Sequence, residues 1–474
     1  MGFKKSLMKN VAVFGSYNYF FFFIEFVSTM ILSRLLGPEE FGFVVIIFVV
    51  SGFIQWMFLN AGLSQAVIRT DYGSTFFKLL FNLAVWIGMF MSLILILLAY
   101  PIALFKNNLS LIFPTIVTSA SLVLSTIVIV PRAILLKELK FNILGKYTTL
   151  SALVGISLMI LMAYTGFSYW SLIVPNIIRE FLFYYLIKRK VNFGFYFYNW
   201  SYTKFAYKKV KNLVNTYLIF NVINYWSTNL DKFLISKFYG DAIVGIYNRS
   251  YRFLQMGIKL INTVFGSVLL PSLKKEIEAN NEYKKGLLDI LDIVHLLGFL
   301  FSIALVIIPK FVVRVLWGED WLGVADYMPY FGAIIPLQTL IIACDDLYVL
   351  EMKEKSLLRV GVPASIILIL GIVIGSFISA LDVARLYAAF FVVLQVPYHL
   401  IFGHYKVLNF PVRLILTFWL PKIAFSMAIL YSLLYLEPIV SQVIFGAYSV
   451  YLGLTHIKNF RLASTIIKEK LRKK

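Results

Sequence analysis

The sequence contains little cysteine, histidine or charge, and each shortage excludes a class of protein. A single cysteine in 474 residues, Cys344, excludes an intrachain disulfide, a cysteine-rich metal site and an iron–sulfur cluster. The 4 histidines show no ligand spacing such as H-x-x-x-H, so we expect neither a metal site nor a cofactor. Charged residues make up 14% of the chain, against about 25% in soluble globular proteins, whereas 60% of it is hydrophobic. A soluble enzyme, a metalloenzyme and a secreted disulfide scaffold are therefore poor interpretations.

Apolar runs of roughly 18–25 residues recur along the whole chain, and each is long enough to cross about 30 Å of hydrocarbon. No soluble domain separates them. The sequence therefore predicts an all-α integral membrane protein with about fourteen transmembrane helices. The expected helices cover residues 11–33, 41–64, 76–100, 111–131, 143–164, 167–187, 209–235, 242–269, 287–308, 327–350, 358–380, 384–403, 413–436 and 438–456.

The basic residues are distributed unevenly between the two sides of the membrane. The chain carries 44 Lys and Arg against 23 Asp and Glu, a net charge of +21. When the expected helices alternate in direction, 32 of these cations fall on the side of the N-terminus and 7 on the other side. This asymmetry follows the positive-inside rule and predicts that both termini are cytoplasmic. It also accounts for the net charge, so we expect membrane lipids as partners and no nucleic acid.

A repeat relates the two halves of the chain at an offset of 203 residues. The segment SRLLGPEEFG (33–42) matches SKFYGDAIVG (236–245) at the serine, the basic residue and both glycines. The third helix of each copy is predicted to end at a proline, Pro101 and Pro309. Six helices is an even number, so both copies enter the membrane in the same direction, as parallel repeats do. We expect two such bundles to enclose a cavity at their interface and to rock against each other, which gives alternating access.

The repeat divides the chain into four predicted parts. Residues 1–188 form an N-lobe of six helices, and residues 189–208 form a basic cytoplasmic linker at the membrane interface. Residues 209–403 form a C-lobe of six helices. Two extra helices and a basic cytoplasmic tail occupy residues 404–474.

Polar side chains at membrane depth are the candidate functional residues, because a charge in hydrocarbon costs a few kcal/mol unless it faces a cavity. In the helix 242–269, several polar residues, four of them at 248, 252, 255 and 259, share an arc of roughly 140° at 100° per residue. The helix 209–235 also has a polar face. The predicted lining of a cationic cavity consists of Asn18, Arg34, Arg179, Tyr217, Asn221, Asn224, Asn248, Arg249, Arg252, Gln255 and Lys259.

Some of these residues have a structural alternative. Arg249 can reach water at the outer interface. The neighbours Arg179 and Glu180 can lock adjacent helices together, and Asp231 with Lys232 can form a local pair near a helix end.

Two further residues are expected to be structural. Lys422 lies outside the two repeats, where a role in packing or in reaching the interface is the stronger interpretation. For His295, a hydrogen-bonded helix contact is expected more than a titrating site.

The chemistry of the predicted cavity indicates its cargo. Guanidinium and ammonium groups bind phosphate oxygens, whereas amide and phenol groups hydrogen-bond sugar hydroxyls. An anionic and polar cargo is therefore expected. If a lipid tail stays in the bilayer while the head group crosses, the protein is a flippase and needs no catalytic residue.

Several segments resemble one family of transporters. They are LSRLLGPEEFG (32–42), NAGLSQAVIR (60–69), PRAILLKELKF (131–141), NLDKFLISK (229–237) with GIYNRSYR (245–252), and LWGEDW (316–321). In this order they are similar to polysaccharide-type (Wzx-like) flippases of the multidrug/oligosaccharidyl-lipid/polysaccharide exporter superfamily. The resemblance spans roughly residues 8–360.

The resemblance implies twelve core helices in two six-helix lobes, two extra helices, a V-shaped cavity, and alternating access. Its implied cargo is an undecaprenyl-diphosphate-linked oligosaccharide, such as an O-antigen unit of lipopolysaccharide, moved to the periplasmic leaflet of the bacterial inner membrane. A polysaccharide polymerase and a chain-length regulator are implied as further partners. Coupling to a proton or sodium gradient occurs in the superfamily, and Glu25 and Asp231 are the candidate coupling carboxylates.

Two other functions stay open from the sequence. A multidrug exporter of the same fold would favour an acidic, aromatic pocket for organic cations. A polysaccharide polymerase is also polytopic, but it would need a large outer loop, and the longest outer loop expected here covers only residues 310–326.

Overall fold

The computed structural model consists of helices, and no strand occurs in the residues that it describes. These residues are 3–59, 63–69, 73–191, 198, 200–264, 283–351, 353–436 and 439–452. Some side chains within helices are also outside the description, among them those of the predicted site residues Asn18, Tyr217 and Asn221. The predicted all-α class is confirmed.

The chain divides into two compact units. Unit 1 comprises Met1–Ile246 and Leu316–Trp321, and unit 2 comprises Tyr247–Val315 and Leu322–Lys474. The helices of unit 1 are α1 (Phe3–Leu35), α2 (Pro38–Leu59), α3 (Leu63–Arg69), α4 (Ser74–Lys106), α5 (Ile112–Lys137), α6 (Phe141–Tyr164), α7 (Trp170–Val191) and α8 (Trp200–Tyr239). Helix α9 (Asp241–Val264) begins in unit 1 and continues into unit 2. The compact units do not test the predicted lobe boundaries, which stay a prediction.

Unit 2 is organised around α13 (Val324–Leu350), which packs against four neighbouring helices of its unit. Its other elements are α11 (Tyr283–Ile307), α12 (Pro309–Leu316), α14 (Glu354–Ser376), α15 (Ala380–Phe390), α16 (Val396–Tyr398), α17 (Val412–Tyr435) and the helix Ile439–Leu452. The π-helical segment Phe391–Gln395 joins α15 to α16, and a second one, His399–Tyr405, follows α16, so that together they form one span.

Eleven of the described helices are long and apolar enough to cross a membrane. The other three predicted spans correspond to α8, α9 and the helix Ile439–Leu452. Helix α9 carries three cations, Arg249, Arg252 and Lys259, within 18 residues, whereas the last described helix is short. The most polar spans are therefore those that begin the second sequence repeat.

Two prolines at which a predicted helix ends, Pro101 and Pro131, lie inside helices in the structure. Helix α4 continues through Pro101 to Lys106, so the prediction that this helix ends at Pro101 is wrong. Pro131 likewise lies inside α5, which ends at Lys137. A proline removes one helical hydrogen bond, but a spanning helix tolerates it when neighbouring groups satisfy the freed carbonyl. In the second copy, Pro309 begins the separate helix α12.

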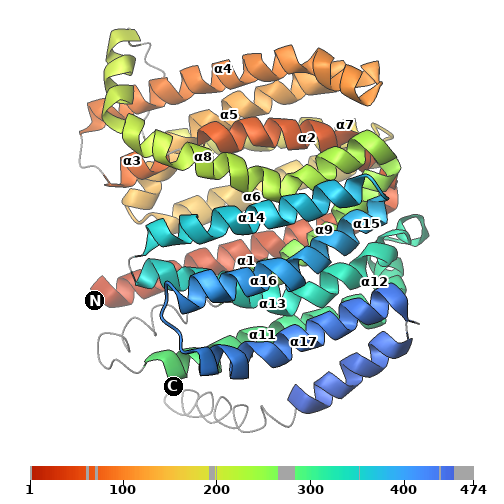
Figure 1. Cartoon of the computed structure of the whole chain (residues 1–474). Coiled ribbons are helices and arrows are strands. Elements are labelled where there is room, and N and C mark those ends of the chain that lie inside the picture. Colours follow the sequence, from red (N-terminus) through yellow and green to blue (C-terminus); the bar gives the residue numbers. More distant parts are fainter. Residues whose placement is uncertain are drawn as a thin grey trace. The chain divides into compact units, whose positions relative to one another are not determined.

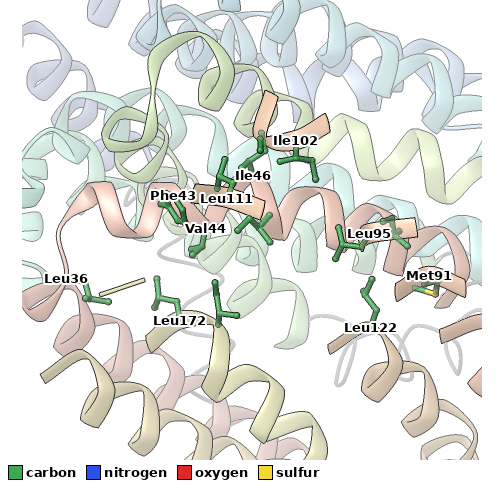
Figure 2. Close-up of a cluster of buried hydrophobic side chains, with 14 of the residues drawn as sticks. Leu36, Phe43, Val44, Ile46, Met91, Leu95, Ile102, Leu111, Leu122 and Leu172 are labelled. Atoms are coloured by element: carbon green, nitrogen blue, oxygen red, sulfur yellow. The ribbon is translucent and has the colours of Figure 1, made fainter. Parts of the chain in front are cut away.

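The core of unit 1 is a cluster of large apolar side chains from α1, α2, α4, α5 and α7. Leu36, Phe43, Leu95 and Leu172 belong to it (Figure 2), and all are buried. In Figure 1, α4 and α5 lie side by side within this unit. This packing holds α2 next to both α5 and α7, and these three helices form the cavity described below.

The two copies of the repeat contact each other at the glycines that reveal the repeat in the sequence. A Cβ atom on Gly42 would lie 1.7 Å from the carbonyl oxygen of Asp241, and one on Gly245 would lie 2.1 Å from that of Pro38. At the offset of 203, Pro38 corresponds to Asp241 and Gly42 to Gly245. The start of α2 and the start of α9 therefore touch reciprocally, through equivalent positions, all within unit 1.

Hydrogen bonds at this junction also connect the two copies of the repeat. The carbonyl oxygen of Ser33, at the end of α1, accepts the indole N–H of Trp321 at 2.7 Å. Its counterpart Ser236, at the end of α8, accepts from the Lys106 ammonium at 2.5 Å, and that ammonium also pairs with Asp241 at 2.7 Å. Each terminal carbonyl is thus satisfied by a donor from the other copy.

The substitution Gly42→Ala should destabilise the protein, because the added methyl group cannot fit beside the Asp241 carbonyl. Overpacking of this kind costs about 1–3 kcal/mol and should lower the thermal unfolding midpoint in detergent. The matched control is Gly361→Ala in α14, where the Cβ would meet nothing within 4 Å. Ala is the better helix former, so this control should keep or raise the midpoint. Equal midpoints for the two variants would contradict the close contact.

Candidate functional site

A polar cavity of about 260 Å³ lies inside unit 1, among α2, α5 and α7. Each helix contributes residues at helical spacing, so one face of each helix lines it. We call it the unit 1 cavity. Its lining consists of Phe48, Ser51, Gly52, Gln55, Thr118, Ser121, Ser125, Asn176, Arg179 and Glu180.

The hydroxyl groups of the unit 1 cavity donate their protons to their own helices. Thr118 donates to the Pro114 carbonyl at 2.8 Å, and Ser121 to the Thr118 carbonyl at 2.7 Å. The hydroxyls of Ser125 and Ser51 and the amide N–H of Asn176 bond to their own helices in the same way. A hydroxyl has one proton and two lone pairs, so its oxygen stays able to accept a hydrogen bond.

The charged pair Arg179 and Glu180 lies at one side of the cavity, where the Arg179 stem packs against a glycine. A guanidinium nitrogen of Arg179 lies 3.4 Å from a carboxylate oxygen of Glu180, and both side chains are about a third exposed, at 33% and 27%. The stem of Arg179 passes over Gly155 of α6, where a Cβ atom would lie 3.0 Å from the Arg179 Cβ. Arg179 therefore lines the unit 1 cavity, which contains none of the other predicted lining residues, and its charge is partly offset by its neighbour.

Helix α9 carries the strongest cationic face, and its residues differ in exposure. Arg252, Gln255 and Lys259 are exposed, and Asn248 is partly buried. Arg249 is only 2% exposed. Arg252 lies about 17 Å along the helix from Asp241, near the middle of α9.

The candidate coupling carboxylates also differ in burial. Asp231 in α8 is 1% exposed, and it accepts the backbone N–H of Lys232 at 2.8 Å. The ammonium of Lys232 donates to the Thr228 carbonyl at 2.8 Å and to Asn229 at 3.0 Å. Glu25 in α1 is only partly buried, so it is the more accessible of the two acids.

The other predicted lining residues are scattered. Arg34 is exposed at the end of α1, and Asn224 is partly buried in α8, where its carbonyl accepts from Ser227 at 2.9 Å. Asn18, Tyr217 and Asn221 have side chains outside the described residues. The assignment of all these residues to one cavity depends on how the two units are placed and stays a prediction.

Lys422 and His295 have structural contacts within unit 2. The Lys422 ammonium pairs with Asp292 of α11 at 2.9 Å and lies 3.6 Å from the centre of the Phe418 ring. The His295 ring bonds to the Tyr448 hydroxyl at 3.0 Å. These contacts attach α17 and the helix Ile439–Leu452 to α11, as expected for residues that hold a bundle together.

Sequence reasoning missed most of the unit 1 cavity. Ser51, Gln55 and the three hydroxyl residues of α5 carry no charge, and they stand within apolar runs. Their spacing is the signal that could have identified them, since Thr118, Ser121 and Ser125 fall at i, i+3 and i+7. In the described residues, no three His, Cys, Asp or Glu side chains gather as metal ligands would.

Two solved structures share the fold. The lipid II flippase MurJ in its inward closed conformation aligns with a TM-score of 0.72 over 94% of this chain and 100% of its own, at 15% identity. An inward-facing multidrug resistance transporter of the MATE family, from the MOP superfamily, aligns with a TM-score of 0.57 over 81% of this chain and 94% of its own, at 13% identity.

Two bacterial proteins are similar in sequence. An uncharacterised membrane protein from the cps region of Klebsiella pneumoniae is 26% identical over 309 residues, which are 63% of this chain and 62% of that protein. The lipopolysaccharide biosynthesis protein WzxC of Escherichia coli (strain K12) is 22% identical over 310 residues, which are 62% of this chain and 60% of that protein. The similarity thus spans less than two thirds of either relative.

The model of one protein family matches residues 31–326, more than half of the chain. Its description is "Polysaccharide biosynthesis protein". The matched residues contain all the resembling segments, from residue 32 to residue 321. With eleven helices able to span a membrane, the chain is a multi-pass membrane protein, and it belongs to the polysaccharide biosynthesis protein family.

Proposed function

We propose that the protein is a flippase for a polyprenyl-diphosphate-linked oligosaccharide, the repeat unit of an O-antigen, a capsule or an exopolysaccharide. It moves the head group from the cytoplasmic to the outer leaflet of the bacterial inner membrane by alternating access, while the lipid tail stays in the bilayer. This task forms and breaks no covalent bond, so the proposed protein is a transporter and not an enzyme.

The observation that carries the proposal is the exposed cationic face of α9. Arg252 lies near the middle of the helix, and Lys259 follows it two turns later on the same face. Exposed cations at this depth face either lipid or water, and lipid contact costs a few kcal/mol for each. A water-filled route along α9 is therefore the favourable arrangement.

The chemistry of this face suits the diphosphate of the cargo. Arg binds phosphate oxygens with two parallel hydrogen bonds, and Lys acts as a compact point charge. Gln255 lies between the two cations on the same face and can hydrogen-bond a sugar or a phosphate oxygen. The relative WzxC, a lipopolysaccharide biosynthesis protein, supports a cargo of the same chemical class.

An exporter of organic cations is the competing function, because a MATE transporter shares the fold. The charge of α9 opposes it, since the exposed side chains at 252 and 259 would repel a cationic substrate. A polymerase is disfavoured by the short link 308–323 between α11 and α13, which leaves no room for a large outer loop.

The proposed topology places both termini in the cytoplasm, as the distribution of basic residues predicts. The finished repeat unit would then be released on the outer side of the membrane. We propose that a polysaccharide polymerase and a chain-length regulator receive it there.

Replacing the two exposed cations together, Arg252→Ala with Lys259→Ala, should abolish surface glycan display when the variant is expressed in a deletion strain. The lipid-linked oligosaccharide should accumulate, because its diphosphate has lost its counter-charges. Display is measured by glycan staining of cells, and accumulation by lipid extraction. The control pair, Lys208→Ala with Lys209→Ala, removes two exposed cations near the start of α8 and should leave display unchanged. Wild-type display from the Arg252 and Lys259 variant, at normal membrane levels, would remove both residues from the mechanism.

Glu25 is the proposed coupling carboxylate, because it is more accessible to protons than the buried Asp231. The variant Glu25→Gln keeps the shape of the side chain but cannot ionise. In proteoliposomes, an imposed proton gradient should speed flipping by the wild type and leave this variant at its gradient-free rate. The control is Glu39→Gln at the exposed start of α2. A Glu25→Gln protein that still responds fully to the gradient would reject this role.

A further inference from the structure

We propose that the unit 1 cavity binds a sugar ring of the cargo and not its diphosphate. This inference rests on the proposed function, and it assigns the two parts of the cargo to different sites. The cationic face of α9 receives the diphosphate, and the cavity among α2, α5 and α7 receives a monosaccharide unit.

The hydrogen-bonding character of the cavity argues for a ligand rich in donors. The protons of the hydroxyls at 51, 118, 121 and 125 are already engaged with helix carbonyls, so these oxygens face the cavity as acceptors. Asn176 uses one N–H on the Leu172 carbonyl at 2.7 Å, which leaves its oxygen as an acceptor. The carboxylate of Glu180 is an acceptor as well.

A sugar satisfies these acceptors, and a phosphate does not. Sugar hydroxyls and acetamido N–H groups donate hydrogen bonds, whereas the oxygens of a diphosphate only accept them. The one cation of the lining, Arg179, lies beside Glu180, so its charge is partly offset. An incoming diphosphate would meet many acceptors and a carboxylate, and their repulsion opposes binding.

The size and the remaining lining also fit a single ring. Cavities for drug-sized ligands measure roughly 300–1,000 Å³, and at about 260 Å³ this one is slightly smaller. Phe48 is 37% exposed and offers an apolar ring on which a sugar face can lie. Gln55 adds a donor and an acceptor, and Arg179 adds donors for ring or hydroxyl oxygens.

Gly155 positions Arg179, the charged hydrogen-bond donor of this site. Because a Cβ atom at Gly155 would lie only 3.0 Å from the Arg179 Cβ, the glycine leaves room for the Arg179 stem, and this side chain lines the cavity beside Glu180. A larger residue at 155 would displace the guanidinium. Arg179 thus serves sugar recognition, in place of the phosphate contact that its charge alone indicates.

The test measures binding of separate probes to the purified full-length protein in lipid nanodiscs. The probes are glucose, galactose, N-acetylglucosamine and, separately, inorganic pyrophosphate, each followed by the thermal unfolding midpoint over a concentration series. At least one sugar should raise the midpoint of the wild type. The variant Ser121→Leu with Ser125→Leu fills the cavity and should weaken that sugar at least about tenfold, while pyrophosphate binding stays unchanged.

Three further variants make the result specific. The control Ser157→Leu changes an exposed serine of α6 that does not line the cavity, so it should bind sugar normally. The variant Gln55→Leu reaches the cavity from α2 and should weaken the sugar even if the α5 variant fails to fold. The variant Arg252→Gln with Lys259→Gln should show the reverse pattern, with pyrophosphate binding lost and sugar binding kept.

The inference is overturned if no sugar raises the wild-type midpoint, or if the cavity variants lose pyrophosphate instead of sugar. The proposed function is judged separately, by surface glycan display in a deletion strain. Normal display without the protein would refute the flippase, whatever the binding data. If display depends on the protein but the cavity variants bind sugar as well as the wild type does, only the sugar site is refuted.

Discussion

Hydrocarbon offers no hydrogen-bond partner, so each polar group at membrane depth must be bonded, paired or in contact with water. Some polar groups meet this requirement within the protein. The Lys422 ammonium is paired with Asp292, and the hydroxyls of α5 donate to their own helix. Arg252 and Lys259 are exposed, and the unit 1 cavity presents acceptors with few donors. The need for hydrogen-bond partners thus distinguishes groups whose bonds hold the bundle together from groups that are exposed or line a cavity, where water or cargo can reach them.

The repeat gives this arrangement its framework. Gly42 and Gly245 bring backbones of the two copies into contact, and the carbonyls of Ser33 and Ser236 each accept a donor from the other copy. Because both copies use equivalent positions, one short sequence pattern fixes both sides of the junction. The same junction sets where α9 begins, and therefore how deep Arg252 lies along it.

The sequence predicted the helices well, because their apolar runs are uninterrupted, and it offered Arg179, Arg252 and Lys259 as candidate cavity residues, because charge is rare in such runs. It also identified Gly42 and Gly245 as equivalent, but it could not reveal that they touch, since contact depends on tertiary packing. The helix end predicted at Pro101 was wrong, because the loss of one hydrogen bond at the proline was given more weight than the apolar pattern that continues beyond it. The hydroxyls of α5 were missed, since serine and threonine in a membrane helix usually satisfy themselves and resemble their apolar neighbours.

The central claim is that the cationic face of α9 borders water and not lipid. The chain suits a direct measurement, because its one cysteine, Cys344, is buried and can be replaced by serine. In that background, Arg252→Cys is treated in native membranes with a water-soluble, charged thiol reagent and, in parallel, with a lipid-soluble one. The account predicts rapid labelling by the water-soluble reagent, and protection when lipid-linked oligosaccharide is abundant. Labelling by the lipid-soluble reagent alone would contradict it.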